Sequence, residues 1–153
     1  MATVEVTRRM AADPSRVYAL IADVTRMDQW SPEVAGARWT RGEPGTVGAR
    51  FRGRNRNGLL RWSTDCTVTA VEPGRRFAFT VTRLGMPISS WEFRLTARDG
   101  GCQVQELTTD RRSRLLRIIT PLGTGVARRA EHNRRTMEAT LESLDGAANR
   151  PPA

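Results

Sequence analysis

Glu106 is the acidic residue whose position in the sequence has chemical consequences. The dipeptide Asp99-Gly100 predicts a two-residue hairpin turn, which places Glu106 opposite Phe93 on an otherwise apolar face. An unpaired buried carboxylate is costly, so this side chain must be paired, protonated or in contact with water. Such a group could orient a ligand carbonyl or phenolate, or it could act as a general acid or base.

Two arginines are candidate partners for Glu106. Alternation along the strands also turns Arg83 inward, and we expect it to be the polar partner; Arg8 on the first strand is a second inward arginine. In the alternative interpretation, Glu106 only forms a structural ion pair or lies at a frayed end of the sheet. If the site is catalytic, we expect Glu106, Arg83 and Tyr18 to carry the proton transfers.

Other chemistries lack the residues they need. All 25 basic residues are arginine, so no lysine can form a Schiff base. The one histidine, His132, falls about 100° from the inner stripe of its helix, which predicts a surface position without a catalytic triad. Cys66 and Cys102 lie about 14 Å apart across three strand spacings and should be free thiols. No metal-site spacing is present, and we expect no cofactor.

Two further turns extend the inner face. Asn57-Gly58 predicts a two-residue hairpin turn, and Pro73-Gly74 predicts a tight turn. The cross-strand pairs expected from all three turns put apolar side chains on one face. These pairs are Ala49–Cys66, Phe51–Thr64 and Gly53–Trp62; then Thr64–Arg83, Cys66–Val81, Val68–Phe79 and Ala70–Phe77; and last Trp91–Thr108, Phe93–Glu106 and Leu95–Val104.

The same alternation explains the arginines at every second position from 50 to 56. With Phe51 and Gly53 facing inward, these arginines point outward, with Asp65 across from Arg50 and Arg61 across from Arg54. The stripe is typical of the solvated face of a half-buried sheet. Because the net charge is +9, an alternative function is a basic surface that binds a membrane or a nucleic acid. No aromatic residue lies between the arginines on this face to stack on bases, so we expect no nucleic-acid partner.

Helical segments flank these strands. Residues 3–10 alternate as a strand, and Asp13-Pro14 is typical of a helix start, with the helix ending near Asp23 and a short one following over 25–30. The segment 111–119 shows no clear cap, and 120–125 should interrupt any helix there. An amphipathic helix is predicted from Val126 to Leu144. We therefore expect one domain over 1–145 and a disordered tail over 146–153.

In this order the elements resemble the helix-grip fold of the START-like (SRPBCC) superfamily, in particular its polyketide cyclase/dehydrase and lipid-transport family. The resemblance covers the chain up to Gly146 and rests on the following motifs: Asp13-Pro14-Ser-Arg-Val-Tyr18, Gln29-Trp30-Ser31-Pro32, Gly48-Ala-Arg-Phe51, Arg61-Trp62, Val71-Glu-Pro-Gly74-Arg-Arg-Phe77, Trp91-Glu-Phe93 and Thr140-Leu-Glu-Ser-Leu144. It implies an α+β fold in which a seven-stranded curved antiparallel sheet wraps around the long C-terminal helix, with a hydrophobic cavity between them.

A cavity protein of this kind would sequester or carry an apolar, aromatic, lipid or polyketide-like molecule. The alternative from another class is a polyketide cyclase or dehydratase that acts in the same cavity. The entrance is expected near 84–90 and 118–125, where glycines and prolines loosen the backbone. No signal peptide or membrane span is visible, so we expect a cytoplasmic location. We also expect a monomer or a homodimer. The expected cavity residues are Trp39, Phe51, Trp62, Thr64, Phe79, Val81, Trp91, Phe93, Asn133 and Met137.

Overall fold

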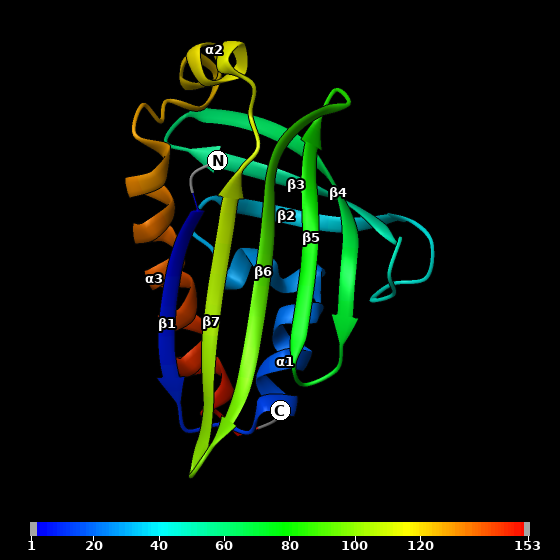
Figure 1. Ribbon diagram of the computed structural model, residues 1–153, viewed down its shortest axis with the longest axis vertical. Coiled ribbons are helices and arrows are strands. Elements are labelled where there is room, and N and C mark those ends of the chain that lie inside the picture. The colour runs from blue at the N-terminus through cyan, green and yellow to red at the C-terminus, as the bar shows by residue number, and fades with distance from the viewer. Residues whose placement is uncertain (1–2, 152–153) are drawn as a thin grey trace.

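Seven strands form one antiparallel sheet with the order β1-β7-β6-β5-β4-β3-β2 in the computed structural model, which describes residues 3–151 (Figure 1). All neighbours except β1 and β7 are consecutive in the chain, so short hairpins build most of the sheet. This is the seven-stranded sheet expected from the sequence. The strands are β1 (Thr3–Met10), β2 (Val34–Arg41), β3 (Arg50–Asn57), β4 (Leu60–Glu72), β5 (Arg76–Arg83), β6 (Met86–Arg98) and β7 (Gly101–Asp110).

The hairpin between β6 and β7 has the predicted register. Its two-residue turn is Asp99-Gly100, and Gly100 adopts a φ of 75°, a conformation that glycine accepts without strain. The structure therefore confirms the pairs Phe93–Glu106, Leu95–Val104 and Trp91–Thr108.

The hairpin between β3 and β4 is shifted by two residues from the prediction. The turn is Gly58-Leu59 rather than Asn57-Gly58, so Gly53 faces Thr64 and Trp62 faces Asn55. Asn57 stays in β3 because its amide donates a hydrogen bond of 2.8 Å to the carbonyl of Thr124. A shift of two preserves which side chains face inward, so the inner face is unchanged although the predicted pairs are wrong.

The hairpin between β4 and β5 has the predicted register near its centre and loses it near its turn. Cys66–Val81 and Val68–Phe79 are confirmed. A register shift between Val68 and Ala70 then places Ala70 opposite Ala78 instead of Phe77. A bulge of this kind adds one residue to one strand and bends the sheet.

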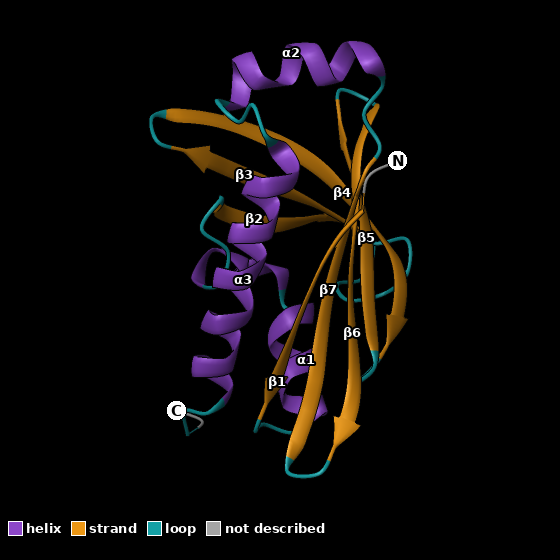
Figure 2. Cartoon of the chain, turned by 60° about the vertical axis from the view of Figure 1, so that its left-hand side comes forward, coloured by secondary structure: helices purple, strands orange, loops and turns teal. Residues whose placement is uncertain are grey.

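Within residues 3–151, three helices and one 3-10 segment accompany the sheet. Helix α1 (Pro14–Ala22) begins where predicted, because the Asp13 carboxylate accepts a hydrogen bond of 2.8 Å from the Ser15 N–H. The 3-10 segment (Val24–Gln29) follows directly. Helices α1 and α3 (Arg129–Ala148) lie on the same side of the sheet, and β2 to β4 curve around α3 (Figure 2).

The chain around α2 and α3 differs from the prediction. Helix α2 (Arg114–Thr124) is continuous through Pro121; Ser113 caps its start, and Gly125 ends it with a φ of 69°. Helix α3 begins at Arg129 rather than Val126, and Ala130 on its expected inner stripe is exposed. At its other end it continues to Ala148, into the segment expected to be disordered. The last residues of that expected tail, 152 and 153, lie outside the described residues.

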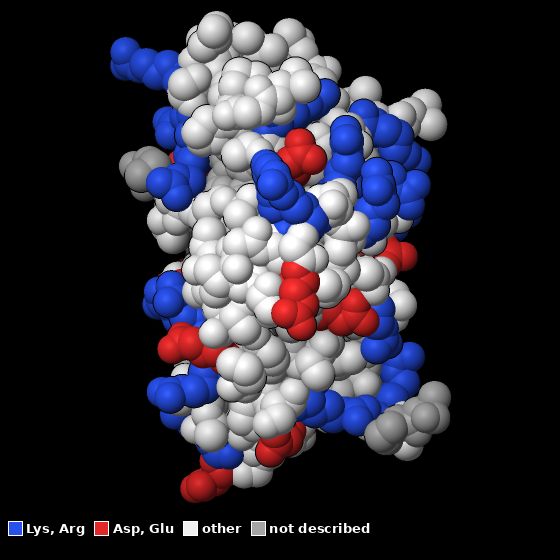
Figure 3. Space-filling view, turned by 90° about the vertical axis from the view of Figure 1, so that its right-hand side faces the viewer, with Lys and Arg blue, Asp and Glu red and all other residues white. Residues whose placement is uncertain are grey.

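The outer face of the sheet carries the arginine stripe as expected. Arg50, Arg52, Arg54 and Arg56 are all exposed, and none of them forms an ion pair within residues 3–151. Asp65 faces Arg52 rather than Arg50, because of the two-residue shift. Arginines and acidic groups are interspersed over much of the face seen in Figure 3. Of the helices within 3–151, none combines the length and the apolar character needed to span a bilayer.

Candidate functional site

A cavity of about 170 Å³ lies between the inner face of the sheet and helix α3. Its wall is mostly apolar, with a few polar groups at one end and at the mouth. An apolar cavity of similar size, about 150 Å³, can hold a benzene molecule. Nine of the ten side chains expected at the cavity line it, namely Phe51, Trp62, Thr64, Phe79, Val81, Trp91, Phe93, Asn133 and Met137.

Trp39 is the expected cavity residue that lies elsewhere. It sits on β2 opposite Phe51, and its ring packs edge-to-face on Phe51 with centroids 5.5 Å apart. Phe51 makes a second edge-to-face contact with Phe79 at 5.2 Å. Trp39 therefore packs beside a residue of the cavity wall without lining the cavity itself.

Glu106 faces this cavity from β7, between Val6 of β1 and Phe93 of β6. Only 3% of its surface is exposed, and its Oε2 atom has no hydrogen-bond partner in the part of the chain that the structure describes. Burial raises the pKa of Glu106 well above its ordinary value. Burial therefore favours the protonated carboxylic acid, which has an O–H group to donate.

The predicted pairing of Glu106 with Arg83 is wrong. Arg83 is the last residue of β5, and although it borders the cavity it is exposed at the end of the sheet. No opposite charge lowers the pKa of Glu106. Arg8 does turn toward α3, but it forms an ion pair of 2.8 Å with Asp145 instead.

Tyr18 is buried but does not line the cavity. Its ring packs edge-to-face on Phe77 with centroids 6.3 Å apart, and its hydroxyl has no partner within the described residues. Burial raises the pKa of the Tyr18 phenol. The structure therefore does not place Tyr18 beside Glu106 for the proton transfers suggested by the sequence.

Two further buried polar atoms also lack hydrogen-bond partners. Thr108 Oγ1, two residues further along β7, and Asn133 Oδ1 on α3 are buried without a hydrogen bond among residues 3–151. Asn133 lines the cavity with Glu106. Buried polar atoms without partners are costly in a native protein, so their presence here needs an explanation.

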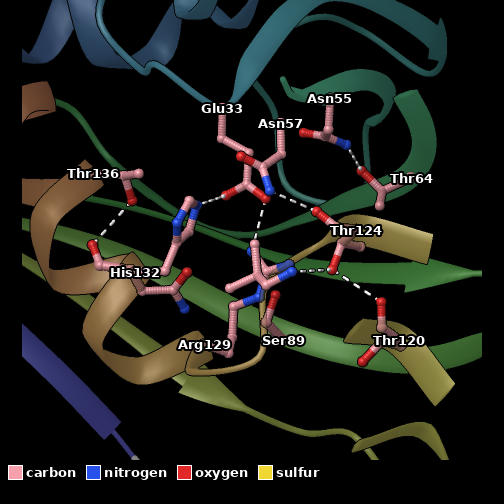
Figure 4. A network of polar contacts seen from close by, with 12 residues as sticks. Glu33, Asn55, Asn57, Thr64, Ser89, Thr120, Thr124, Arg129, His132 and Thr136 are labelled. Atoms are coloured by element: carbon pink, nitrogen blue, oxygen red, sulfur yellow. Dashed lines mark hydrogen bonds and ion pairs between the residues drawn. The ribbon is translucent and has the colours of Figure 1, made fainter. Parts of the chain in front are cut away.

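A cluster at the cavity mouth was not expected from the sequence. Glu33 accepts a hydrogen bond of 2.7 Å from Arg129, and its other carboxylate oxygen lies 3.4 Å from His132 Nε2 (Figure 4). Burial favours the neutral form of Glu33, but His132 and Arg129 outweigh it and lower the pKa of Glu33. His132 is half-buried, so its predicted surface position is wrong.

Helix α2 is held over the mouth by polar contacts. Arg112 pairs with Asp110 through two guanidinium nitrogens at 2.9 and 2.7 Å, and a third nitrogen donates to Thr120 Oγ1 at 2.6 Å. The Asn57 amide binds the Thr124 carbonyl. Burial raises the pKa of Asp110, but its hydrogen bonds with Arg112 outweigh this and lower it.

The inner surface also carries one of the two thiols. Cys66 lines the cavity, and both cysteines are free and buried, as predicted. Burial raises the pKa of Cys66 to about 12, so its thiol is protonated and unreactive. Within residues 3–151, no group of three or more His, Cys, Asp or Glu side chains is arranged to hold a metal ion.

A curved seven-stranded antiparallel sheet that wraps around a C-terminal helix, with a cavity between them, defines a protein of the START-like helix-grip class. The chain belongs to the family described as Polyketide cyclase / dehydrase and lipid transport, whose model matches residues 1–148. The resemblance seen in the sequence is therefore confirmed. A search of curated proteins finds no match for the chain.

Solved structures show the same fold. The chain is similar to protein CV1439 from Chromobacterium violaceum, with a TM-score of 0.74 and 15% identity over 97% of this chain and 98% of that chain. It is also similar to the Polyketide_cyc-like protein Cgl2372 from Corynebacterium glutamicum, with a TM-score of 0.61 and 27% identity over 97% and 89%.

A third similar structure is the di-domain ARO/CYC protein BexL from the BE-7585A biosynthetic pathway, with a TM-score of 0.73 and 19% identity. The match covers 99% of this chain and 51% of BexL, so the chain spans about half of that protein.

Proposed function

We propose that this protein binds an apolar small molecule that carries a hydrogen-bond-accepting oxygen, in the cavity between the sheet and α3. The observation that carries the proposal is the buried carboxyl group of Glu106, which faces the cavity and whose Oε2 atom has no hydrogen-bond partner among residues 3–151. A ligand oxygen at this point would accept the hydrogen bond that the protein leaves unmade.

The surrounding side chains favour a flat, unsaturated ligand. Trp62, Trp91 and Phe93 line the cavity and offer aromatic surfaces. Asn133 on the facing helix adds a second polar group that could orient the ligand. Membership of a family named for polyketide cyclases, dehydrases and lipid transport supports an aromatic, polyketide-like or lipid-like ligand.

A catalytic role is the second candidate, and the raised pKa of Glu106 favours it. A general acid must hold its proton at the working pH, as a buried carboxyl group can. A cyclase or dehydratase could use this proton on a polyketide oxygen. Glu106→Gln separates the two functions, because glutamine still donates a hydrogen bond but cannot transfer a proton. Retained binding with lost turnover of a β-hydroxyketone would establish catalysis, whereas a wild-type protein without turnover would favour binding alone.

Filling the cavity tests the proposed binding site. Gly53 lies on the inner face of β3, where an added Cβ would come within 3.3 Å of Thr64 Oγ1 and within 4.0 Å of Asn55 Nδ2. Gly53→Val should therefore narrow the cavity and weaken binding of a neutral naphthalene-based fluorescent probe by about tenfold or more, while Val remains favourable in a strand.

Arg52→Val is the matched control, because it places the same side chain on the outer face of the same strand. It should bind the probe as the wild type does. A wild-type protein that does not bind neutral apolar probes, or equal binding by Gly53→Val, would contradict a ligand site in this cavity.

A further inference from the structure

Exposed apolar side chains gather at the end of the molecule that carries α2. Eight of the nine large hydrophobic residues exposed within the described chain belong to α2, the β3–β4 hairpin or the β5–β6 hairpin. All three segments lie at the top of the molecule in Figures 1 and 2. We call these residues the apolar rim: Leu59, Leu60, Leu84, Met86, Leu115, Ile118, Ile119 and Leu122.

Helix α2 exposes its apolar side to solvent, whereas an ordinary surface helix packs that side against the core. Leu115, Ile118, Ile119 and Leu122 follow the i, i+3, i+4, i+7 spacing of an apolar stripe, which normally faces the core. Here the stripe faces outward, with Ile118 72% and Leu122 83% exposed. The side of α2 that borders the cavity is polar instead, and carries Thr120 and Thr124.

Polar contacts fix this orientation. The hydrogen bond from Arg112 to Thr120 and the one from Asn57 to the Thr124 carbonyl both lie on the cavity side of α2. Turning the helix to bury its apolar stripe would break both of them. These hydrogen bonds therefore hold α2 with its apolar stripe exposed on the surface.

The hairpins beside α2 extend the same surface. Leu59 at the turn between β3 and β4 is 99% exposed, and Leu84 at the turn between β5 and β6 is 84% exposed. Leu84 also has a φ of 50°, an uncommon conformation for a residue other than glycine. A turn that places leucine rather than a polar residue at such a position supports a role for the side chain outside the protein.

The charge around the rim has one sign. The three segments 57–62, 83–88 and 111–125 contain no aspartate or glutamate. Asp110 precedes the third segment but is already paired with Arg112. The uppermost part of the face shown in Figure 3 is largely uncharged, and below it lie arginines with an acidic group among them. The arginines of the three segments are Arg61, Arg83, Arg111, Arg112, Arg114 and Arg117.

We propose that the apolar rim docks onto the surface of an anionic lipid bilayer, with α2 lying in the interface and the cavity mouth turned toward the lipid. Apolar side chains flanked by arginine are the pattern of helices that lie in a membrane interface. Each arginine close to an anionic surface strengthens binding by about fivefold. A second copy of this chain fits less well, because its own arginines would meet these.

Binding to vesicles tests this surface. Wild-type protein should float with vesicles of phosphatidylcholine and phosphatidylserine, bind vesicles of phosphatidylcholine alone more weakly, and be released by salt. The double variant Ile118→Ser/Leu122→Ser should bind the mixed vesicles at least about tenfold more weakly than the wild type does, because its serine side chains do not enter the lipid. Both sites are exposed, so folding should be unchanged in circular dichroism.

Val47→Ser is the matched control, because Val47 is the remaining exposed large hydrophobic residue, 62% exposed and outside the rim. It should bind vesicles as the wild type does. The proposal is overturned if the wild type ignores anionic vesicles, or if the double variant binds them equally. It is also overturned if sedimentation shows that the wild type and Val47→Ser are dimers while the double variant is a monomer, because the rim would then be the contact with a second copy. Glu106→Leu should retain vesicle binding, so this surface is tested separately from ligand binding in the cavity.

Discussion

Replacing Glu106 with glutamine should change how the stability of the protein depends on pH. Burial raises the pKa of Glu106 in the folded protein, whereas in the unfolded chain this group titrates near its ordinary value of 4.5. Between these two values the folded state holds a proton that the unfolded state has released. The free energy of unfolding therefore falls as the pH rises, by about 1.4 kcal/mol per pH unit from this group alone.

This contribution is absent below the unfolded pKa, where both states are protonated, and it stops growing once the pH passes the folded pKa. Glu106→Gln cannot ionise and so lacks the contribution at every pH. The buried amide adds an offset that is the same at each pH. The variant should therefore gain stability relative to the wild type as the pH rises above about 4.5, with a slope of about 1.4 kcal/mol per pH unit.

Urea unfolding between about pH 5 and about pH 8 measures this difference. Glu142→Gln is the matched control, because Glu142 is an exposed carboxyl group on α3, and its curve should run parallel to that of the wild type. If the Glu106→Gln curve also runs parallel, Glu106 is ionised in the folded protein. The argument from burial would then be refuted.

The remaining predictions concern the cavity mouth and the thiols. Glu33→Gln should lower stability at neutral pH by about 1–2 kcal/mol, because Arg129 and His132 lose their half-buried carboxylate partner. The pKa of Glu33 is lowered in the folded protein, so this stabilisation exists above the unfolded pKa and disappears on acidification, the opposite sign to Glu106. Urea unfolding at neutral and acidic pH should therefore show that the stability deficit of Glu33→Gln shrinks as the pH falls. A deficit that stays constant would contradict the ion pair. Cys66 and Cys102 should resist a thiol reagent in the folded protein and both react after unfolding without reductant; recovery of no free thiol would contradict their separation across the sheet.

Features encoded by local residues could be predicted from the sequence. Asp99-Gly100 specifies a turn by its own backbone preferences, and the register of β6 and β7 follows from it. Asp13 and Pro14 likewise specify the start of α1. The inward position of Glu106 followed from this one turn and from the alternation of side chains along β7.

Features that depend on distant contacts could not be predicted. The turn after β3 is displaced because Asn57 binds Thr124, 67 residues away in the chain. Glu33 precedes β2 in a connecting segment without alternation, and its partner Arg129 lies 96 residues further on. Helix α2 continues through Pro121 because Ser113 caps it and Arg112 binds Thr120. The proline alone therefore did not predict where this helix ends.

The most direct test of the proposed site compares two ligands that differ only in whether they carry a hydrogen-bond acceptor. Acetophenone carries a carbonyl oxygen where α-methylstyrene carries a methylene group, and calorimetry can measure the affinity of both for the wild type and for Glu106→Leu. A hydrogen bond from Glu106 to the carbonyl predicts that the ratio of the affinity for acetophenone to the affinity for α-methylstyrene is about fivefold to tenfold higher in the wild type than in Glu106→Leu. The same affinity ratio in the wild type and in Glu106→Leu would contradict the role of Glu106 as the donor in the cavity.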